Sequence, residues 1–420
     1  MKRKWLSILF LMILFGFSTC EEYHENFVLT GLDVLTEEEN EFLLNKKVGI
    51  VTNHTAYNHK GEHLSDVINS MENVTLTAIF APEHGFRGTA EAGELITEGI
   101  DSATGAKIYS IYGTTRKPTP AMLADVDLLI FDIQDIGARF YTYISTMGNV
   151  MEAGAENGIP VLILDRPNPL GGWVEGPLLD MKWQSFVGQY PIPIRHGLTI
   201  GELARMIKGE GWINNADSLD LTILPIKHWN STMFWQETGL KWINPSPNIN
   251  TMNAALLYPG LCLLEATNVS EGRGTHYAFE WIGADFIKGN ELAEALKAEN
   301  IEGLNIEPIA FTPVDLPGKA TNPKYKDKEI EGISLTVTDP KAFQSVTFGV
   351  VLLKTLRDLY PDNFQVTRPE WLHRLWGNES LFSALEKTIS FDALLDSVQK
   401  DETSFREFKK KYTLYEKNTH

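Results

Sequence analysis

The chain has 420 residues, of which 43% are hydrophobic and 22% charged, and its formal net charge is −18 at pH 7. This composition excludes an intrinsically disordered protein and allows one large hydrophobic core or two smaller ones. The acidic excess, without a basic stripe, argues against a nucleic-acid-binding protein.

The N-terminus has the pattern of a secretory signal peptide over residues 1–20. Basic residues at 2–4 precede an apolar stretch from 5 to 17. This stretch is shorter than the roughly 20 apolar residues of a typical membrane-spanning helix. Cys20 ends the sequence FSTC, which loosely resembles the site where bacterial lipoproteins are cleaved and lipid-modified. We therefore expect an exported protein of the periplasm or cell envelope, anchored to the membrane by a lipid on Cys20. The alternative is an ordinary signal peptide followed by a chance cysteine.

Residues 27–244 alternate between strand-like and helix-like segments. Apolar runs that predict strands, each ending in polar residues, lie at 47–53, 76–82, 127–135 and 160–168. Helical patterns lie between them at 35–46, 62–71 and 143–158. Runs that are apolar on both faces are typical of a parallel sheet covered by helices. The pattern predicts an α/β domain with a doubly wound parallel sheet.

Residues 245–415 are predicted to form a second, smaller α+β domain. The chain becomes rich in Pro and Asn after residue 245, and a mixed segment follows through 339. Helical patterns then lie at 345–360, 370–377 and 390–400.

Polar clusters follow the predicted strands of the first domain. Their sequences are TNHTA, APEHGFRG, DIQDIGARFYTY and DRPNPLGG, beginning at residues 52, 81, 132 and 165. Ligands of such sheets bind beyond the carboxyl ends of the strands, so these clusters should meet at one edge. The substrate-binding candidates there are Asn53, His84, Arg87, Asp132, Arg139, Tyr141, Tyr143, Arg166 and Asn168. Aromatic rings beside carboxylates and an arginine suit a sugar, although a salt-bridged strand end is the alternative.

Glu83 is the first catalytic candidate. A glutamate at the end of a buried strand can have a raised pKa and serve as a general acid, whereas a solvated loop carboxylate would have no such role. Glu91 and Glu94 follow it closely. Two carboxyl groups flanking the bond are the usual requirement for glycoside hydrolysis, and their separation decides between retention and inversion. Sequence spacing does not supply that separation.

A second polar cluster lies at residues 267–280 and contains Asn268, Glu271 and Arg273 among glycines. Such a loop could fold over the site of the first domain, or it could be a plain surface turn. Arg195 precedes a helix with a capping-box sequence and remains available for an anionic ligand.

The sequence lacks the motifs of several common metal, nucleophile and nucleotide sites. The histidines at 54, 59 and 63 do not have a zinc-binding spacing. Neither a serine-hydrolase elbow, nor a phosphate-binding loop, nor a clean dinucleotide fingerprint is present. We therefore expect no metal and no cofactor.

Ordered motifs along residues 27–415 resemble those of the bacterial exo-β-N-acetylmuramidases, a glycoside hydrolase family. The motifs include FAPEHGFRG, EAGE, LLIFDIQDIGARFYTYISTM, LDRPNPLGG, YPIPIRHGLTIGELA, WINPSPNI, ALLYPGLCLLEATNVSEGRGT and YTLY. The resemblance implies a Rossmann-like catalytic domain, a smaller C-terminal domain and a site in the cleft between them. It also implies release of N-acetylmuramic acid from the non-reducing ends of peptidoglycan fragments, during cell-wall turnover and recycling, without a cofactor.

The resemblance assigns the catalytic glutamate of the PEHG motif to Glu83. Its partner remains open among Glu91, Glu94 and Glu271, of which we favour Glu271. N-acetylmuramic acid carries a lactyl carboxylate, which one of four arginines could bind in a bidentate manner. These are Arg87, Arg166, Arg195 and Arg273.

Two other functions fit the same chain. One is a lipoprotein that binds muropeptides or other glycans without turnover. The other is an amidase or esterase that acts on muropeptides. Such an enzyme would be expected to have a metal site or an activated serine or cysteine. The expected partners are muramyl-glucosamine saccharides, with no nucleic acid and with the membrane reached only through the lipid.

Overall fold

Seven strands form the larger sheet of this computed structural model, which describes residues 28–37, 41–87, 94 and 98–415. Their order is β3-β4-β2-β1-β5-β6-β7, and every neighbouring pair is parallel except β3 and β4. The strands are β1 (Lys47–Thr52), β2 (Thr75–Ala81), β3 (Gly99–Ile100), β4 (Lys107–Ser110), β5 (Leu128–Asp132), β6 (Val161–Leu164) and β7 (Leu221–Leu224). The predicted α/β class is therefore confirmed.

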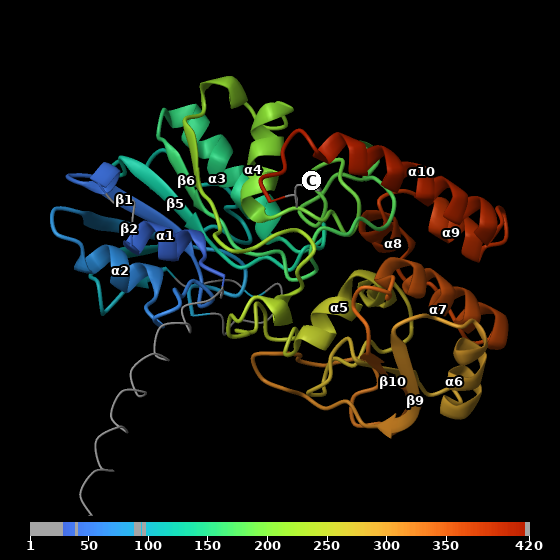
Figure 1. Ribbon diagram of the computed structural model, residues 1–420. Helices are drawn as coiled ribbons and strands as arrows, with labels where there is room; N and C mark the ends of the chain where they lie inside the picture. The colour runs from blue at the N-terminus through green and yellow to red at the C-terminus, as the bar shows by residue number, and fades with distance from the viewer. Residues whose placement is uncertain (1–27, 38–40, 88–93, 95–97, 416–420) are drawn as a thin grey trace, which may run out of the picture.

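Alternate side chains of each central strand face two separate layers of the core. Leu129 and Phe131 of β5 pack in the layer that contains α3 and α4, whereas Leu128 and Ile130 pack in the layer that contains α1 and α2. The two helix pairs cover opposite faces of the sheet (Figure 1). These helices are α1 (Gly31–Glu37), α2 (Leu64–Ser70), α3 (Tyr143–Asn157) and α4 (Ile200–Gly209). Burial on both faces is the reason that the strands read as continuous apolar runs.

The predicted helix at 35–46 is wrong in its position. The structure has α1 at Gly31–Glu37 and a short 3₁₀ turn at Glu41–Leu43. The helix begins early because the Asp33 carboxylate accepts hydrogen bonds from the backbone N–H and the hydroxyl of Thr30, at 2.7 and 2.8 Å. The predicted end of α3 is correct, since Gly158 takes a left-handed conformation with φ 66°.

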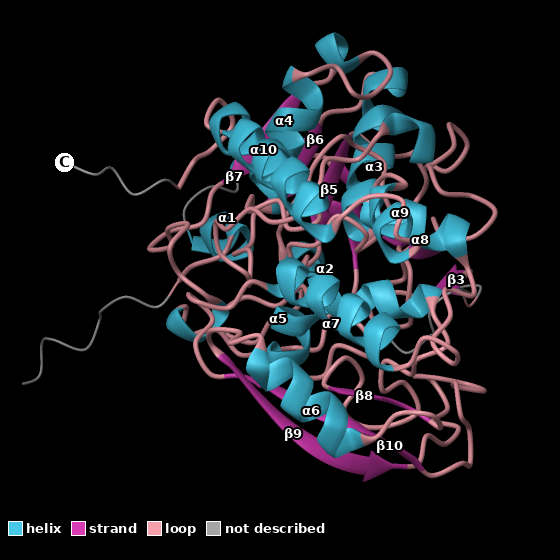
Figure 2. Cartoon of the chain, turned by 90° about the vertical axis from the view of Figure 1, so that its right-hand side faces the viewer, coloured by secondary structure: helices cyan, strands magenta, loops and turns pink. Residues whose placement is uncertain are grey.

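A three-stranded antiparallel sheet forms the second part of the molecule, in the order β8-β10-β9. The strands are β8 (Trp281–Ala284), β9 (Leu304–Phe311) and β10 (Ile330–Val337). Helix α6 packs on β9, and Figure 2 shows this sheet at the opposite end of the molecule from α4. The remaining helices are α5 (Met252–Leu261), α6 (Gly289–Ala298), α7 (Ser345–Leu359), α8 (Pro369–Trp376), α9 (Ser380–Leu385) and α10 (Phe391–Lys409).

The end of the chain returns from the second part to the first. Lys409, at the end of α10, donates hydrogen bonds of 2.8 Å to the carbonyl oxygens of Gly172 and Gly197. Figure 1 shows α10 reaching the loops beside α4. The two parts are thus joined both by the 244–250 segment and by the C-terminus. Within the described ranges, no helix is long and apolar enough to cross a membrane.

Candidate active site

Four polar segments meet at the carboxyl edge of the larger sheet. Asn53 follows β1, Glu83 follows β2, Asp132 ends β5 and Arg166 follows β6. Because β2, β1, β5 and β6 are consecutive in the sheet, these residues lie side by side along one edge. This is the edge where open α/β sheets bind their ligands.

Two hydroxyl groups hold the carboxylate of Glu83. Tyr112 donates to its Oε1 at 2.8 Å, and Thr142 donates to its Oε2 at 2.5 Å. The chain turns sharply after Glu83, because His84 and Gly85 both adopt positive φ, at 68° and 77°. The residue is only 9% exposed. A glutamate that is held in place at this edge and largely shielded from solvent is suited to react with a bound ligand.

Tyr143 links Asn53, at the sheet edge, to the start of the second part of the molecule. Its hydroxyl accepts a hydrogen bond from Asn53 at 2.9 Å and donates one to the carbonyl oxygen of Pro245 at 3.0 Å. Burial, and secondarily the charge of Glu83, raise the pKa of Tyr143. The hydroxyl therefore stays protonated and remains a donor. The Tyr141 ring packs edge-on against Tyr143, with 5.0 Å between centroids.

Several predicted binding residues already have their polar groups engaged within the protein. Arg166 forms a buried bidentate pair with Asp132, with 2.9 Å for its Nη2 contact. Arg139 donates to the carbonyl oxygens of Pro177, Ile192 and Leu375, and burial lowers its pKa to about 9. A direct contact of either guanidinium with substrate would require these bonds to break.

The same holds for two further candidates. Asn168 donates to the Leu198 carbonyl at 2.9 Å and accepts from the Leu170 amide, so it holds a turn. Arg195 is only 2% exposed and pairs with Glu175. Both side chains are well placed to keep the edge of the sheet rigid.

Glu271 lies in an ion-pair cluster of the second part. Lys324 contacts its Oε2 at 2.9 Å, and the Arg273 Nε lies 3.3 Å from its Oε1. Burial by itself would raise the pKa of Glu271, but the two cations outweigh it and the pKa is lowered. Glu271 is therefore ionised at neutral pH, which suits a base or nucleophile and not an acid. Asn268 braces this loop, since its amide donates to the Asn363 carbonyl at 2.8 Å.

A row of aromatic rings leads from Glu83 towards this cluster. Tyr141 packs on Tyr143 and, with 6.1 Å between centroids, on Tyr258 of α5. Tyr258 packs on Phe279, over which the Arg273 guanidinium lies at 5.2 Å. The two glutamates thus have separate hydrogen-bond partners, and the buried rings of Tyr141, Tyr258 and Phe279 pack in a continuous row in the core between the two parts.

The remaining predicted site residues are exposed or lie outside the described residues. Arg87 has a side chain that is 66% exposed and pairs with Asp101 at 2.8 Å. Glu94 is exposed. Glu91, favoured as a third catalytic candidate, and Cys20 lie outside the described residues.

Two residues that the structure brings to the site were not predicted from the sequence. Tyr112 and Thr142 hold Glu83. Thr142 directly precedes the helix predicted at 143–158, which was the available signal, whereas Tyr112 adjoins no predicted element. Asp135 is a buried carboxylate that accepts from the Gly137 amide at 2.7 Å, and burial raises its pKa to about 7. Its neighbour His196 lies 3.8 Å away, and burial lowers the pKa of that histidine to about 3. The histidine is neutral, so it does not offset a charge on Asp135.

The three histidines after β1 have separate partners. His54 contacts the Asn244 carbonyl at 2.7 Å, His59 contacts Asp33 at 2.7 Å, and His63 contacts the Asn53 carbonyl at 2.8 Å. In the parts of the chain that the structure describes, no group of three or more His, Cys, Asp or Glu side chains is placed to hold a metal ion.

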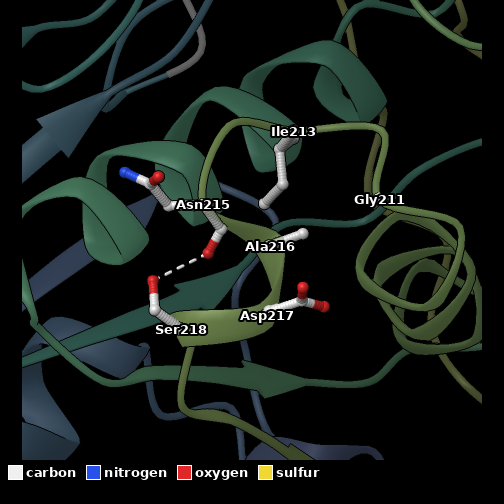
Figure 3. A pocket seen from close by; sticks show the side chains of 6 residues that line it. All are labelled: Gly211, Ile213, Asn215, Ala216, Asp217 and Ser218. Atoms are coloured by element: carbon white, nitrogen blue, oxygen red, sulfur yellow. Dashed lines mark hydrogen bonds between the residues drawn. The ribbon is translucent and has the colours of Figure 1, made fainter.

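A hollow of about 390 Å³ between α4 and β7 lies away from this site (Figure 3). Ser218 donates to the Asn215 carbonyl at 2.8 Å at its edge. The hollow precedes β7, so it lies at the amino edge of the sheet. A second cavity, of about 310 Å³, opens beside Glu271.

The larger sheet carries a hydrogen-bonded, nearly buried glutamate at its carboxyl edge, and the second part of the molecule holds an ionised glutamate. A pair of carboxyl groups is what enzymes of the glycoside hydrolase class use. Residues 48–253 match the family model "Exo-beta-N-acetylmuramidase NamZ, N-terminal", and residues 256–415 match its C-terminal counterpart. The chain therefore belongs to the exo-β-N-acetylmuramidase NamZ family, as the motifs predicted.

Relatives of known name or structure agree with this membership. The chain is 43% identical over 389 residues to the peptidoglycan beta-N-acetylmuramidase NamZ of Bacillus subtilis (strain 168), covering 92% of this chain and 91% of that protein. Two crystal structures of DUF1343 family proteins from Bacteroides fragilis NCTC 9343 are similar. One has a TM-score of 0.85 and 34% identity, and covers 93% of this chain and 100% of its own. The other has a TM-score of 0.74 and 35% identity, and covers 93% and 99%.

Proposed function

We propose that this protein is an exo-acting glycoside hydrolase that releases N-acetylmuramic acid from the non-reducing ends of peptidoglycan fragments. Membership of the family and the 43% identity to a peptidoglycan beta-N-acetylmuramidase support the proposal. The observation that carries it is Glu83, held by Tyr112 and Thr142 at the edge of the sheet. The expected partners are muramyl-glucosamine saccharides.

The proposed chemistry divides two roles between Glu83 and Glu271. One carboxylic acid must protonate the leaving oxygen while a second carboxylate acts as nucleophile or base. Lys324 and Arg273 keep Glu271 ionised, so it cannot hold the proton at neutral pH. The acid role therefore falls to Glu83.

The test is hydrolysis of the disaccharide N-acetylmuramyl-β-1,4-N-acetylglucosamine, with the products followed by mass spectrometry. Wild-type protein should release both free sugars, and Glu83→Gln should lose turnover by at least about a hundredfold. Glu407→Gln is a matched control, because Glu407 is an exposed glutamate paired with Lys410. Near wild-type turnover by a folded Glu83→Gln variant would contradict the role of Glu83. Stoichiometric binding of the intact disaccharide by the wild type would favour a glycan-binding protein instead.

We also propose that the protein is exported and held at the membrane by a lipid on Cys20. The basic residues at 2–4, the apolar stretch at 5–17 and the FSTC sequence support this. Mass spectrometry of the mature N-terminal peptide should find an acylated Cys20 in the membrane fraction. The Cys20→Ala variant should lose the modification. Cleavage at another position, without acylation, would contradict the proposal.

A further inference from the structure

The cavity beside Glu271 is large enough for a sugar-sized group. Its volume is about 310 Å³, at the lower end of the range for small-molecule sites. Three segments far apart in the sequence line it, namely 265–273, 319–324 and the residue before α8, Arg368. Neither the residues at 319–324 nor Arg368 were among the site residues predicted from the sequence.

The floor of this cavity is balanced in charge. Glu265 and Glu271 supply two carboxylates, and Arg273 and Lys324 supply two cations that contact them at 2.8 to 3.3 Å. Lys324 has no remaining capacity for a ligand, because it also donates to the carbonyl oxygens of Leu264 and Val269. An anion on the floor would meet no unneutralised positive charge.

The mouth of the cavity is different, because it carries two cations without a carboxylate partner within the described part of the chain. The Lys319 ammonium donates to the neutral Asn250 side chain at 3.0 Å. The Arg368 guanidinium lies over the Trp371 ring at 4.9 Å, and the residue is exposed. Among the described residues, two cations without a carboxylate partner thus lie at one opening of a chain whose net charge is −18. They form a local positive potential suited to an anionic ligand.

The mouth is connected to the edge that carries Glu83. Asn250, which holds Lys319, also accepts from the Asn244 side chain at 3.4 Å. The carbonyl of Asn244 contacts His54, directly after Asn53. The carbonyl of Pro245 receives the Tyr143 hydroxyl. The 244–250 segment therefore hydrogen-bonds both to residues at the carboxyl edge of the larger sheet and to Lys319 beside the cavity.

We propose that Arg368 and Lys319 form a subsite for a carboxylate of the muramyl ligand. This inference rests on the proposed function, because it names a recognition element of the same site. A guanidinium binds a carboxylate through two parallel hydrogen bonds, and the nearby ammonium adds a point charge. A neutral sugar at the same subsite would leave both cations without a partner, so the subsite discriminates against N-acetylglucosamine. The carboxylate can be that of the lactyl ether or one from an attached peptide.

Binding is best measured in the Glu83→Gln background, which prevents turnover. The probes are N-acetylmuramic acid, its lactyl methylamide and muramyl dipeptide, measured by isothermal titration calorimetry. Wild-type contacts should favour the acid over the methylamide by about tenfold to a hundredfold, the range for hydrogen bonds to a charged group. Arg368→Gln and Lys319→Gln should each remove much of that preference without weakening binding of the methylamide. Lys341→Gln is the matched control, because Lys341 is an exposed lysine that pairs with Glu237.

The probes also identify the source of the carboxylate. If Arg368→Gln weakens N-acetylmuramic acid and not muramyl dipeptide, the lactyl carboxylate occupies the subsite. If it weakens muramyl dipeptide more than the free acid, a peptide carboxylate does. Unchanged binding of all three probes in both variants would overturn the subsite. A thermal melt checks that each variant is folded, which is expected because Arg368 is exposed.

Failure of the subsite is separable from failure of the proposed function. Turnover of the disaccharide by the Arg368→Gln variant should show a raised KM with little change in kcat, because the lost contact is made in both ground and transition states. Turnover with an unchanged KM, together with unchanged binding of muramyl dipeptide, would overturn the subsite and leave the hydrolase. Acid-selective binding without any sugar release by the wild type would overturn the hydrolase and leave the subsite.

Discussion

The Tyr415 hydroxyl donates a hydrogen bond to Asp165 across 250 positions of sequence, with 2.7 Å between the two oxygens. The same hydroxyl accepts from the Ile226 amide at 2.9 Å. Asp165 directly follows β6 and directly precedes Arg166, which pairs with Asp132. The end of the chain therefore holds the sheet edge on which the candidate site is built.

We expect Tyr415→Phe to destabilise the protein by about 1–3 kcal/mol, because it removes a donor from buried Asp165 and leaves the Ile226 amide unpaired. Urea unfolding measures the change. Tyr277→Phe is the control, since Tyr277 is 45% exposed and should change stability little. Equal stability of the two variants would show that the Tyr415 bond does not hold the sheet edge.

Removing a hydroxyl that holds Glu83 should reduce activity more than stability. Thr142→Val deletes the donor to Oε2, and Thr142 makes no side-chain capping bond to α3, so the helix should keep its start. We expect kcat on the disaccharide to fall by about tenfold, with a similar loss for Tyr112→Phe. Steady-state kinetics measure the change, and thermal melts should differ little from the wild type. Unchanged kcat in both variants would show that these hydroxyls do not orient the carboxylate.

Lys324→Met should destabilise the second part of the molecule by about 3 kcal/mol, because it leaves a buried carboxylate with one fewer cation. The effect depends on pH in a defined direction. The pKa of Glu271 is lowered below 4.5, so its ion pairs stabilise the folded state above that value. This stabilisation is lost as the pH falls through the folded pKa.

Chemical unfolding at pH 5 and pH 3 tests this dependence. Acidification should cost the wild type more stability than it costs Lys324→Met. Lys326→Met is the control, because Lys326 pairs with Asp315 nearer the surface, where ion pairs contribute little. A larger loss on acidification in Lys324→Met would contradict the account.

Asp135→Asn should change the pH dependence of stability at neutral pH. Burial raises the pKa of Asp135 from 3.8 to about 7, so the folded state keeps a proton that the unfolded state releases between these values. The folded state therefore loses stability as the pH rises to 7, by up to about 1.4 kcal/mol per pH unit. Asparagine stays neutral and should remove this loss.

Unfolding of Asp135→Asn and of the wild type at pH 5, 6, 7 and 8 checks the sign. The variant should gain stability relative to the wild type as the pH rises. Asp362→Asn, at an exposed aspartate, should not. A constant difference across this range would show that Asp135 is ionised in the folded protein throughout.

The positions of the central strands could be predicted from local pattern alone. Residues such as Leu128 and Phe131 belong to a short run that is apolar on both faces, and only a covered parallel strand buries both faces. The convergence of Asn53, Glu83, Asp132 and Arg166 followed from the same argument. The start of α1 could not be predicted in this way, because it depends on the Asp33 carboxylate turning back to Thr30.

The sequence by itself determined the family, the α/β class and the glutamate at the end of β2, because each is carried by residues that are neighbours in the chain. Only the tertiary structure decided which charged side chains are already engaged. Arg166 and Arg195, plausible carboxylate ligands by residue type, are buried in ion pairs. Lys319 and Arg368, beside the second cavity, have no carboxylate partner among the residues that the structure describes. Charge compensation depends on distance in space, and the pairs that decide it are formed by residues far apart in the sequence.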